Sequence, residues 1–264
     1  MSDGFETSFF RENRERLQTL FTGTAPIVIT ANGLLQRNSD VHFPFRQDST
    51  FWYLTGLEEP DLILVMDKGK EYLIAPERDK NRAAFDGAIS YESLITRSGV
   101  EQVLDAKTGW RQLGARLRRV KHVATVAAAP GYISQHGLYT NPARARLVKQ
   151  IKTWNDSVEL LDLRPHITRM RMIKQPVELQ QLQRAIDTTE RTLRTMYRKG
   201  WQSFDKEYEI EAVITAAFRK ADAQHAYQPI VAAGANACTL HYVKNNGPIS
   251  DDSLLLLDVG AEVS

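Results

Sequence analysis

Helical and extended hydrophobic patterns alternate along the first third of the chain. Apolar residues recur at helical spacing among charged ones over residues 7–21 and predict an amphipathic helix. The β-branched run Pro26–Thr30 predicts a strand, and the aromatic run Phe51–Gly56 predicts a second one. Two more strands are expected at residues 62–66 and 72–75, joined as a hairpin through residues 67–70.

The following segments continue this mixture. Helices are expected near Trp110–Arg118 and Asn141–Lys152, with a small-residue strand at Val123–Ala128 between them. Strands mixed with helices favour the α/β class with a mixed sheet for the first domain.

The pattern changes after residue 160. Leu160–Arg171 has the composition of a hinge, and Pro176 suits the first position of a helix, where its missing N–H costs little. Gly200 is a natural stop for this helix, and Ser203 is a candidate cap for the next one. The expected domains are therefore residues 1–166 and 167–264.

Apolar stripes define the buried faces expected for these two helices. The first stripe consists of Leu179, Leu182, Ile186, Leu193 and Met196, and the second of Tyr208, Ile210, Val213, Ile214 and Phe218. Short strands are then expected at residues 229–231, 240–242 and 254–258.

Composition narrows the class of protein. The 264 residues are 42% hydrophobic and 25% charged, which suits one large or two ordinary globular domains with a real core. The net charge of +2 is too balanced to indicate nucleic-acid binding. No apolar run approaches the roughly 20 residues of a membrane span, and the first residues lack a secretory signal pattern. A cytoplasmic protein without a membrane partner is expected.

Cys238 is the only cysteine, so no internal disulfide can form, which suits a reducing compartment. It lacks a Cys–His signature and is interpreted as a small packing residue. Two other groups stay open. The aromatic residues Phe45, Phe51, Trp52 and Tyr53 could stack on a ligand or fill the core. The charged residues Arg37, Asp40 and Arg46 could line a site or lie in a solvated loop.

Asp258 is the most informative residue for chemistry. It ends a run of four leucines, and such a continuous apolar strand is typically buried on both faces. A carboxylate there would need a cation, hydrogen-bond donors or a metal, because an unpaired buried charge costs several kcal/mol. The alternative is an aspartate that caps a turn or pairs with an arginine. Gly260 just after it would let the backbone pass close to another group.

His241 is the second candidate. It lies between apolar Leu240 and Tyr242, and an imidazole can serve as a ligand, an acid–base group or an oxyanion donor near neutral pH. The alternative is a histidine satisfied by backbone hydrogen bonds. The sequence has no His-Glu-x-x-His or Cys-x-x-Cys metal motif.

Several motifs in order resemble one family. The stretches Arg37–Asp40 and Phe43–Gly56, followed by Glu59-Pro60, closely resemble the N-terminal domain of bacterial-type aminopeptidase P. Met170-Arg171 and Lys174–Glu178 resemble the family's entry into its catalytic domain. The second-half motifs are similar to those of pita-bread metallopeptidases: Tyr227–Val231, Gly234, Asn236, Leu240–Tyr242, Asn245 and Leu256–Gly260.

This resemblance implies a dinuclear centre, usually of manganese, held by two Asp, one His and two Glu, that cleaves the bond before a proline at position two. It implies that Asp258 is a metal ligand and that His241 faces the substrate, and it implies proline-containing peptides and a homo-oligomer as partners. The family's other four ligands would follow Ser264, so the 264-residue chain alone is expected to be inactive. Alternatives are a prolidase and a non-catalytic pita-bread peptide-binding module.

Overall fold

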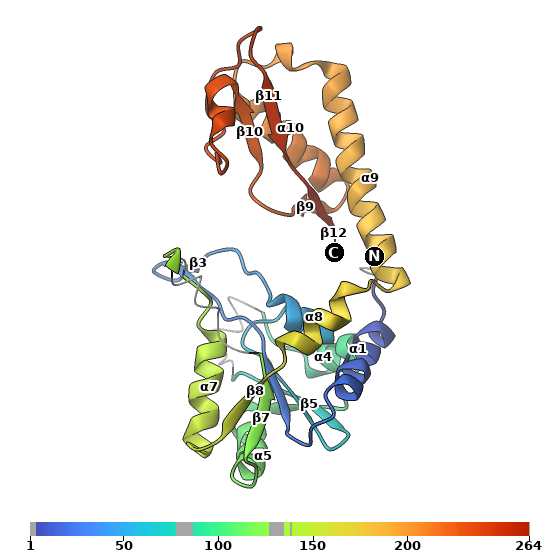
Figure 1. Cartoon of the computed structure of the whole chain (residues 1–264), viewed down its shortest axis with the longest axis vertical. Coiled ribbons are helices and arrows are strands. Elements are labelled where there is room, and N and C mark those ends of the chain that lie inside the picture. The colour runs from blue at the N-terminus through green and yellow to red at the C-terminus, as the bar shows by residue number, and fades with distance from the viewer. Residues whose placement is uncertain (1–3, 78–86, 127–134, 138, 264) are drawn as a thin grey trace. The chain divides into compact units, whose positions relative to one another are not determined.

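The computed structural model describes residues 4–77, 87–126, 135–137 and 139–263 of the chain (Figure 1). Residue contacts divide it into two compact units, Phe5–Ile173 and the residues from Lys174 onward. No described helix is both long and apolar enough to cross a membrane.

The first unit is built on a six-stranded sheet with the order β6-β5-β4-β1-β7-β8. Its strands are β1 (Ile27–Thr30), β4 (Ile63–Asp67), β5 (Lys70–Ala75), β6 (Gln102–Asp105), β7 (His122–Thr125) and β8 (Glu159–Asp162). The β1–β4 and β4–β5 pairs are antiparallel, whereas the three outer pairs are parallel. This mixed sheet confirms the predicted fold class and the hairpin across residues 67–70.

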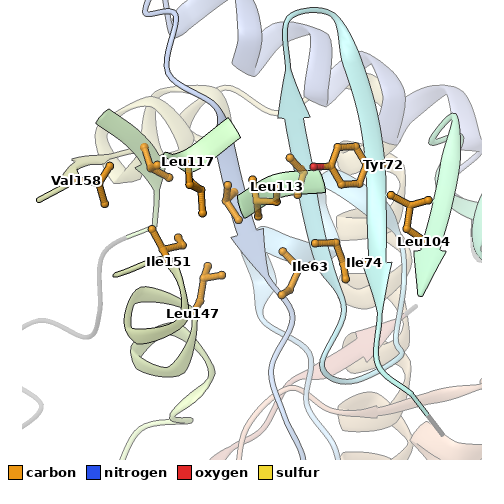
Figure 2. Packing of buried hydrophobic residues seen from close by; sticks show 12 residues of the cluster. Ile63, Tyr72, Ile74, Leu104, Leu113, Leu117, Leu147, Ile151 and Val158 are labelled. Atoms are coloured by element: carbon orange, nitrogen blue, oxygen red, sulfur yellow. The ribbon is translucent and has the colours of Figure 1, made fainter. Parts of the chain in front are cut away.

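Helices pack around this sheet. They are α1 (Thr7–Leu20), α2 (Ser49–Thr55), α4 (Tyr91–Ser98), α5 (Ala106–Leu117), α7 (Ala143–Trp154) and α8 (Arg164–Met172). Figure 2 shows Leu113 and Leu117 of α5 and Leu147 and Ile151 of α7 close to Ile63 and Ile74 of the sheet, in one buried cluster. A small exposed hairpin of β2 (Gln36–Asn38) and β3 (Val41–His42) carries Arg37 and is followed by the exposed Phe43. The strand expected to reach Ala128 ends at Thr125, and residues 127 and 128 lie outside the described residues.

The prediction of a strand at Phe51–Gly56 is wrong, because this segment is helix α2. The Asp48 carboxylate accepts hydrogen bonds from the N–H groups of Thr50 and Phe51 and so caps the helix. Gly56 ends it in the left-handed region, with φ of 67°. Phe51 and Tyr53 are buried, which favours the core interpretation of the aromatics.

The prediction of a hinge at Leu160–Arg171 is also wrong. Residues 159–162 form the edge strand β8, parallel to β7, and α8 follows at once and contacts α1. The basic composition of this segment belongs to the outer face of α8, where Arg169 and Arg171 are exposed. The change of unit comes after Ile173, whereas the sequence pattern placed the border between residues 166 and 167.

The second unit places two helices beside two small sheets. Its elements are α9 (Pro176–Lys199), η1 (Trp201–Ser203), α10 (Glu207–Lys220), β9 (Ala223–His225), β10 (Ile230–Ala233), η2 (Gly234–Cys238), β11 (Leu255–Asp258) and β12 (Ala261–Val263). β10 pairs with β11 and β9 pairs with β12, both antiparallel. Ile210, Ile214 and Phe218 of α10 form the centre of its core.

Helix α9 begins at Pro176 and stops before Gly200, as predicted, but its predicted buried stripe is mostly exposed. Leu179, Leu182 and Ile186 have exposed fractions of 55%, 48% and 57%. Met196 is buried as predicted, and the other buried residues of the helix are Thr188 and Thr192, in its second half, which packs on β12 and α10.

Helix α10 differs from its prediction in two respects. It begins after Lys206, and the Ser203 hydroxyl donates to the Gly200 carbonyl instead of capping it. Tyr208, expected on the buried side, is exposed, whereas Ile210, Ile214 and Phe218 are buried as expected.

Three further expectations for the second unit are wrong. β11 is not buried on both faces, since its residues alternate in burial and, among the described strands, it pairs only with β10. Residues 240–242 form no strand, because Leu240 and His241 lie in a turn after η2. Cys238 is exposed, so it is not a packing residue.

Candidate metal-ligand and substrate-side site

Asp258 is the last residue of β11, paired across the ladder with Ile230 at the start of β10. Its carboxylate is exposed, and its Oδ1 accepts a hydrogen bond of 2.7 Å from the Tyr227 hydroxyl. A Cβ at Gly260 would lie 3.3 Å from the Tyr227 ring, so the glycine allows the ring to pass close to the backbone. The Tyr227 hydroxyl thus holds Asp258. The alternative, that Asp258 caps a turn or pairs with an arginine, is not what the structure shows.

The contact with Asp258 also affects Tyr227 itself. The hydrogen bond to Asp258 raises the pKa of Tyr227, and burial and the negative charge of Asp258 act in the same direction. Tyr227 therefore stays protonated as a donor across the neutral range. One carboxylate oxygen of Asp258 is engaged in this way, and its Oδ2 makes no hydrogen bond to any residue that the structure describes.

His241 lies in the turn that follows η2, with its side chain exposed. Its ring makes no hydrogen bond within the described part of the chain, which disfavours the alternative of a histidine satisfied by the backbone. The structure does not join His241 to Asp258. The loop that carries His241 leaves the Ala233 end of β10, whereas Asp258 faces Ile230 at the other end.

Sequence reasoning missed the residue that organises this loop. Glu207 opens α10, is fully buried, and accepts hydrogen bonds from Tyr242, Asn236 and two backbone N–H groups. Burial raises the pKa of Glu207, but the four donors more than offset this and leave it below its ordinary value. The sequence signal for Glu207 was a glutamate in the first turn of a helix. Such a glutamate usually only stabilises the helix dipole, so it did not indicate a role in holding the loop.

Asn245 was named only as a motif residue, without a role, and it is 1% exposed. It accepts from the Val231 N–H and donates to the Pro229 carbonyl and to Glu211. These bonds attach the end of the loop to the start of β10.

The donor chemistry allows only part of a metal centre. The carboxylate oxygen of Asp258 suits a hard divalent cation. The described residues contain no group of three or more His, Cys, Asp or Glu side chains that could hold a metal ion. Asp258 is therefore a candidate ligand and not a complete site.

Residues 10–124 match the model of the aminopeptidase P N-terminal domain, and residues 180–264 match that of metallopeptidase family M24. By similarity, successive parts of the chain are thus assigned to these two models, which together cover most of its length.

Curated relatives support this assignment. The chain is similar to the Xaa-Pro aminopeptidase of Haemophilus influenzae, with 31% identity over 96% of this chain and 57% of the relative. It is 33% identical to mouse Xaa-Pro aminopeptidase 3, over 90% of this chain and 48% of the relative. The chain thus spans about half the length of these relatives.

Solved structures agree. Pseudomonas aeruginosa aminopeptidase PepP has a TM-score of 0.82 and 26% identity, covering 98% of this chain and 59% of its own. Escherichia coli aminopeptidase P with the inhibitor Pro-Leu has the same TM-score and identity, covering 98% of this chain and 60% of its own.

Proposed function

We propose that the protein containing this chain is a metal-dependent aminopeptidase that removes the first residue from peptides with proline at position two. The observation that carries the proposal is the succession of the two domain matches along one chain. The names of the relatives point to the same reaction, since they are Xaa-Pro aminopeptidases.

Within this function, Asp258 is proposed as a metal ligand and Tyr227 as the donor that orients its carboxylate. Two divalent cations, manganese in view of the oxygen ligation, would lower the pKa of a bound water and polarise the scissile carbonyl. His241, exposed and with no hydrogen bond to the described residues, is proposed to donate to the substrate or to the developing oxyanion.

Three broader expectations belong to the same proposal. The substrates would be proline-containing peptides, the protein would act in the cytoplasm, and it would form a homo-oligomer. The net charge of only +2 fits peptide substrates, because it does not favour a polyanion as the partner.

The test is an assay of the full-length gene product with manganese on an Xaa-Pro-Yaa tripeptide and an Xaa-Pro dipeptide. Release of the first residue from the tripeptide is expected, and Asp258→Asn should reduce kcat/KM by at least about a hundredfold. Cleavage of the dipeptide alone would make the protein a prolidase. Peptide binding without turnover or bound metal would make it a non-catalytic module.

The 264-residue polypeptide offers a matched comparison. It carries Asp258 but no group of metal-binding side chains among its described residues. We therefore expect it to release no residue from the tripeptide under conditions in which the full-length product is active.

A further inference from the structure

The loop that carries His241 is held by a buried carboxylate at both ends and in the middle. Glu207 Oε1 accepts from the Ala233 N–H at 2.7 Å and from Asn236 Nδ2 at 3.0 Å. Its Oε2 accepts from the Tyr242 hydroxyl and from the Gly247 N–H, both at 2.7 Å. One side chain thus contacts the start, the middle and the end of residues 233–247.

A second carboxylate lies one helical turn further along α10. Glu211 Oε2 accepts from Asn245 Nδ2 at 2.8 Å, and Asn245 in turn binds the Pro229 carbonyl and the Val231 N–H, both at 2.9 Å. Asn245 has φ of 46°, a left-handed conformation that asparagine tolerates better than most residues. Residues four apart share one face of a helix, so this face of α10 carries both attachments.

The chemistry of Glu207 is specific to a carboxylate. All four of its partners donate, and two of them are backbone N–H groups that cannot reverse their role. In a glutamine, the NH₂ group would face two of these donors in either orientation of the amide. A buried donor left without an acceptor is costly, so the isosteric change should loosen the loop.

We propose that Glu207 is a positioning residue for His241: together with Glu211 it fixes the loop between β10 and Gly247, and so fixes the place of the imidazole next to Tyr242. The role of His241 towards a substrate rests on the proposed function, but the way in which α10 holds its loop does not.

The test compares Glu207→Gln with Glu209→Gln in the 264-residue chain. Glu209 is a matched control, because it lies on the same helix and accepts two backbone N–H bonds at its start but does not touch the loop. Amide exchange over residues 233–247 should rise about tenfold or more in Glu207→Gln and remain unchanged in the control.

Ring NMR signals separate positioning from general destabilisation. The His241 signals should shift in Glu207→Gln, while those of His225, which lies in the same unit and bonds Thr215, should not. If the loop and His241 are unchanged, or if His225 moves equally, the proposal is overturned. Should Glu207→Gln fail to fold, Tyr242→Phe removes one of the four bonds to Glu207, together with the bonds of the hydroxyl to Asn236 and Asn246, and must still shift His241.

In the full-length product, Tyr242→Phe should lower kcat/KM severalfold, and this effect should vanish in a His241→Ala background. A loosened loop without any loss of turnover would remove His241 from the reaction but leave its positioning intact. The two proposals can therefore fail separately.

Discussion

Arg14 shows how a single residue can connect several elements of the first unit. It is fully buried on α1, and its guanidinium donates to the carbonyls of Leu54 and Ser98 at the ends of α2 and α4. It also pairs with Glu71 on β5, with 2.6 Å between Nε and Oε2. Four elements therefore depend on one charge whose partners are themselves largely buried.

Replacing Arg14 by methionine should destabilise the first unit strongly. The change removes the Arg14 donor from Glu71 Oε2 and from two carbonyls, although Gln18 still donates to Glu71 Oε1. Breaking a buried pair costs about 3–5 kcal/mol. Arg11→Met is the control, because Arg11 pairs with Glu15 on the exposed face of the same helix, where such pairs contribute about 0–1 kcal/mol. Urea unfolding measures both, and equal effects of the two variants would contradict the prediction.

The candidate site could be predicted from the sequence only where its signals are local. Asp258 and His241 stand out through their immediate neighbours and the family motifs. Tyr227 lies 31 residues before Asp258, and Glu207 lies 40 residues before Gly247. Their contacts arise only when β10, β11 and α10 come together, which no local pattern encodes.

In helix α2, the amino-acid composition favours a strand, whereas the capping residues at both ends favour a helix. Its aromatic and β-branched residues favour a strand, but Asp48 and Gly56 close both ends of a helix. A Cβ at Gly56 would lie 2.3 Å from the Phe10 ring, so the close packing of α1 also requires glycine there. Both end signals were present in the sequence, and the apolar run between them obscured them.

Substitutions of Asp48 should separate its two roles. Asp48→Asn keeps an oxygen for the N–H groups of Thr50 and Phe51 but loses the charge that pairs with Arg144. Asp48→Ala loses both. We expect the alanine variant to be about 1 kcal/mol less stable than the asparagine variant, the usual contribution of a cap. Unfolding curves of both variants measure this difference, and identical stabilities would show that the cap contributes nothing.

At the scale of the whole molecule, the chain holds two separate cores. One is built on the six-stranded sheet with α5 and α7, and the other surrounds α10. The order of strands and helices along the chain predicts the mixed class of the first unit, because its strands are continuous apolar runs. The exposed leucines of α9 and the half-exposed β11 could not be predicted in this way, since periodicity shows which face is apolar and not what covers it.

Tyr72 provides a pH-dependent probe of the first core. It lies in the cluster beneath α5, and burial raises its pKa from 10.0 to about 12, with a smaller contribution from the charge of Asp67 and an opposing hydrogen bond from Gln112. Below pH 10 the phenol is protonated in both states. Between pH 10 and about 12 the unfolded chain releases this proton and the folded unit does not, so stability falls as the pH rises.

Tyr72→Phe should therefore flatten the alkaline loss of stability of the first unit. Between pH 10 and about 12, the free energy of unfolding should fall by about 2–3 kcal/mol less in this variant than in the parent protein. Tyr139→Phe, fully exposed in the same unit, should leave the loss unchanged. Of the four tryptophans only Trp201 lies in the second unit, so urea unfolding followed by fluorescence in a Trp201→Phe background reports on the first unit alone. The two variants remove the same phenol group, from a buried position at Tyr72 and from an exposed one at Tyr139. If both variants lose stability at alkaline pH as the parent protein does, the titration of Tyr72 does not cause that loss.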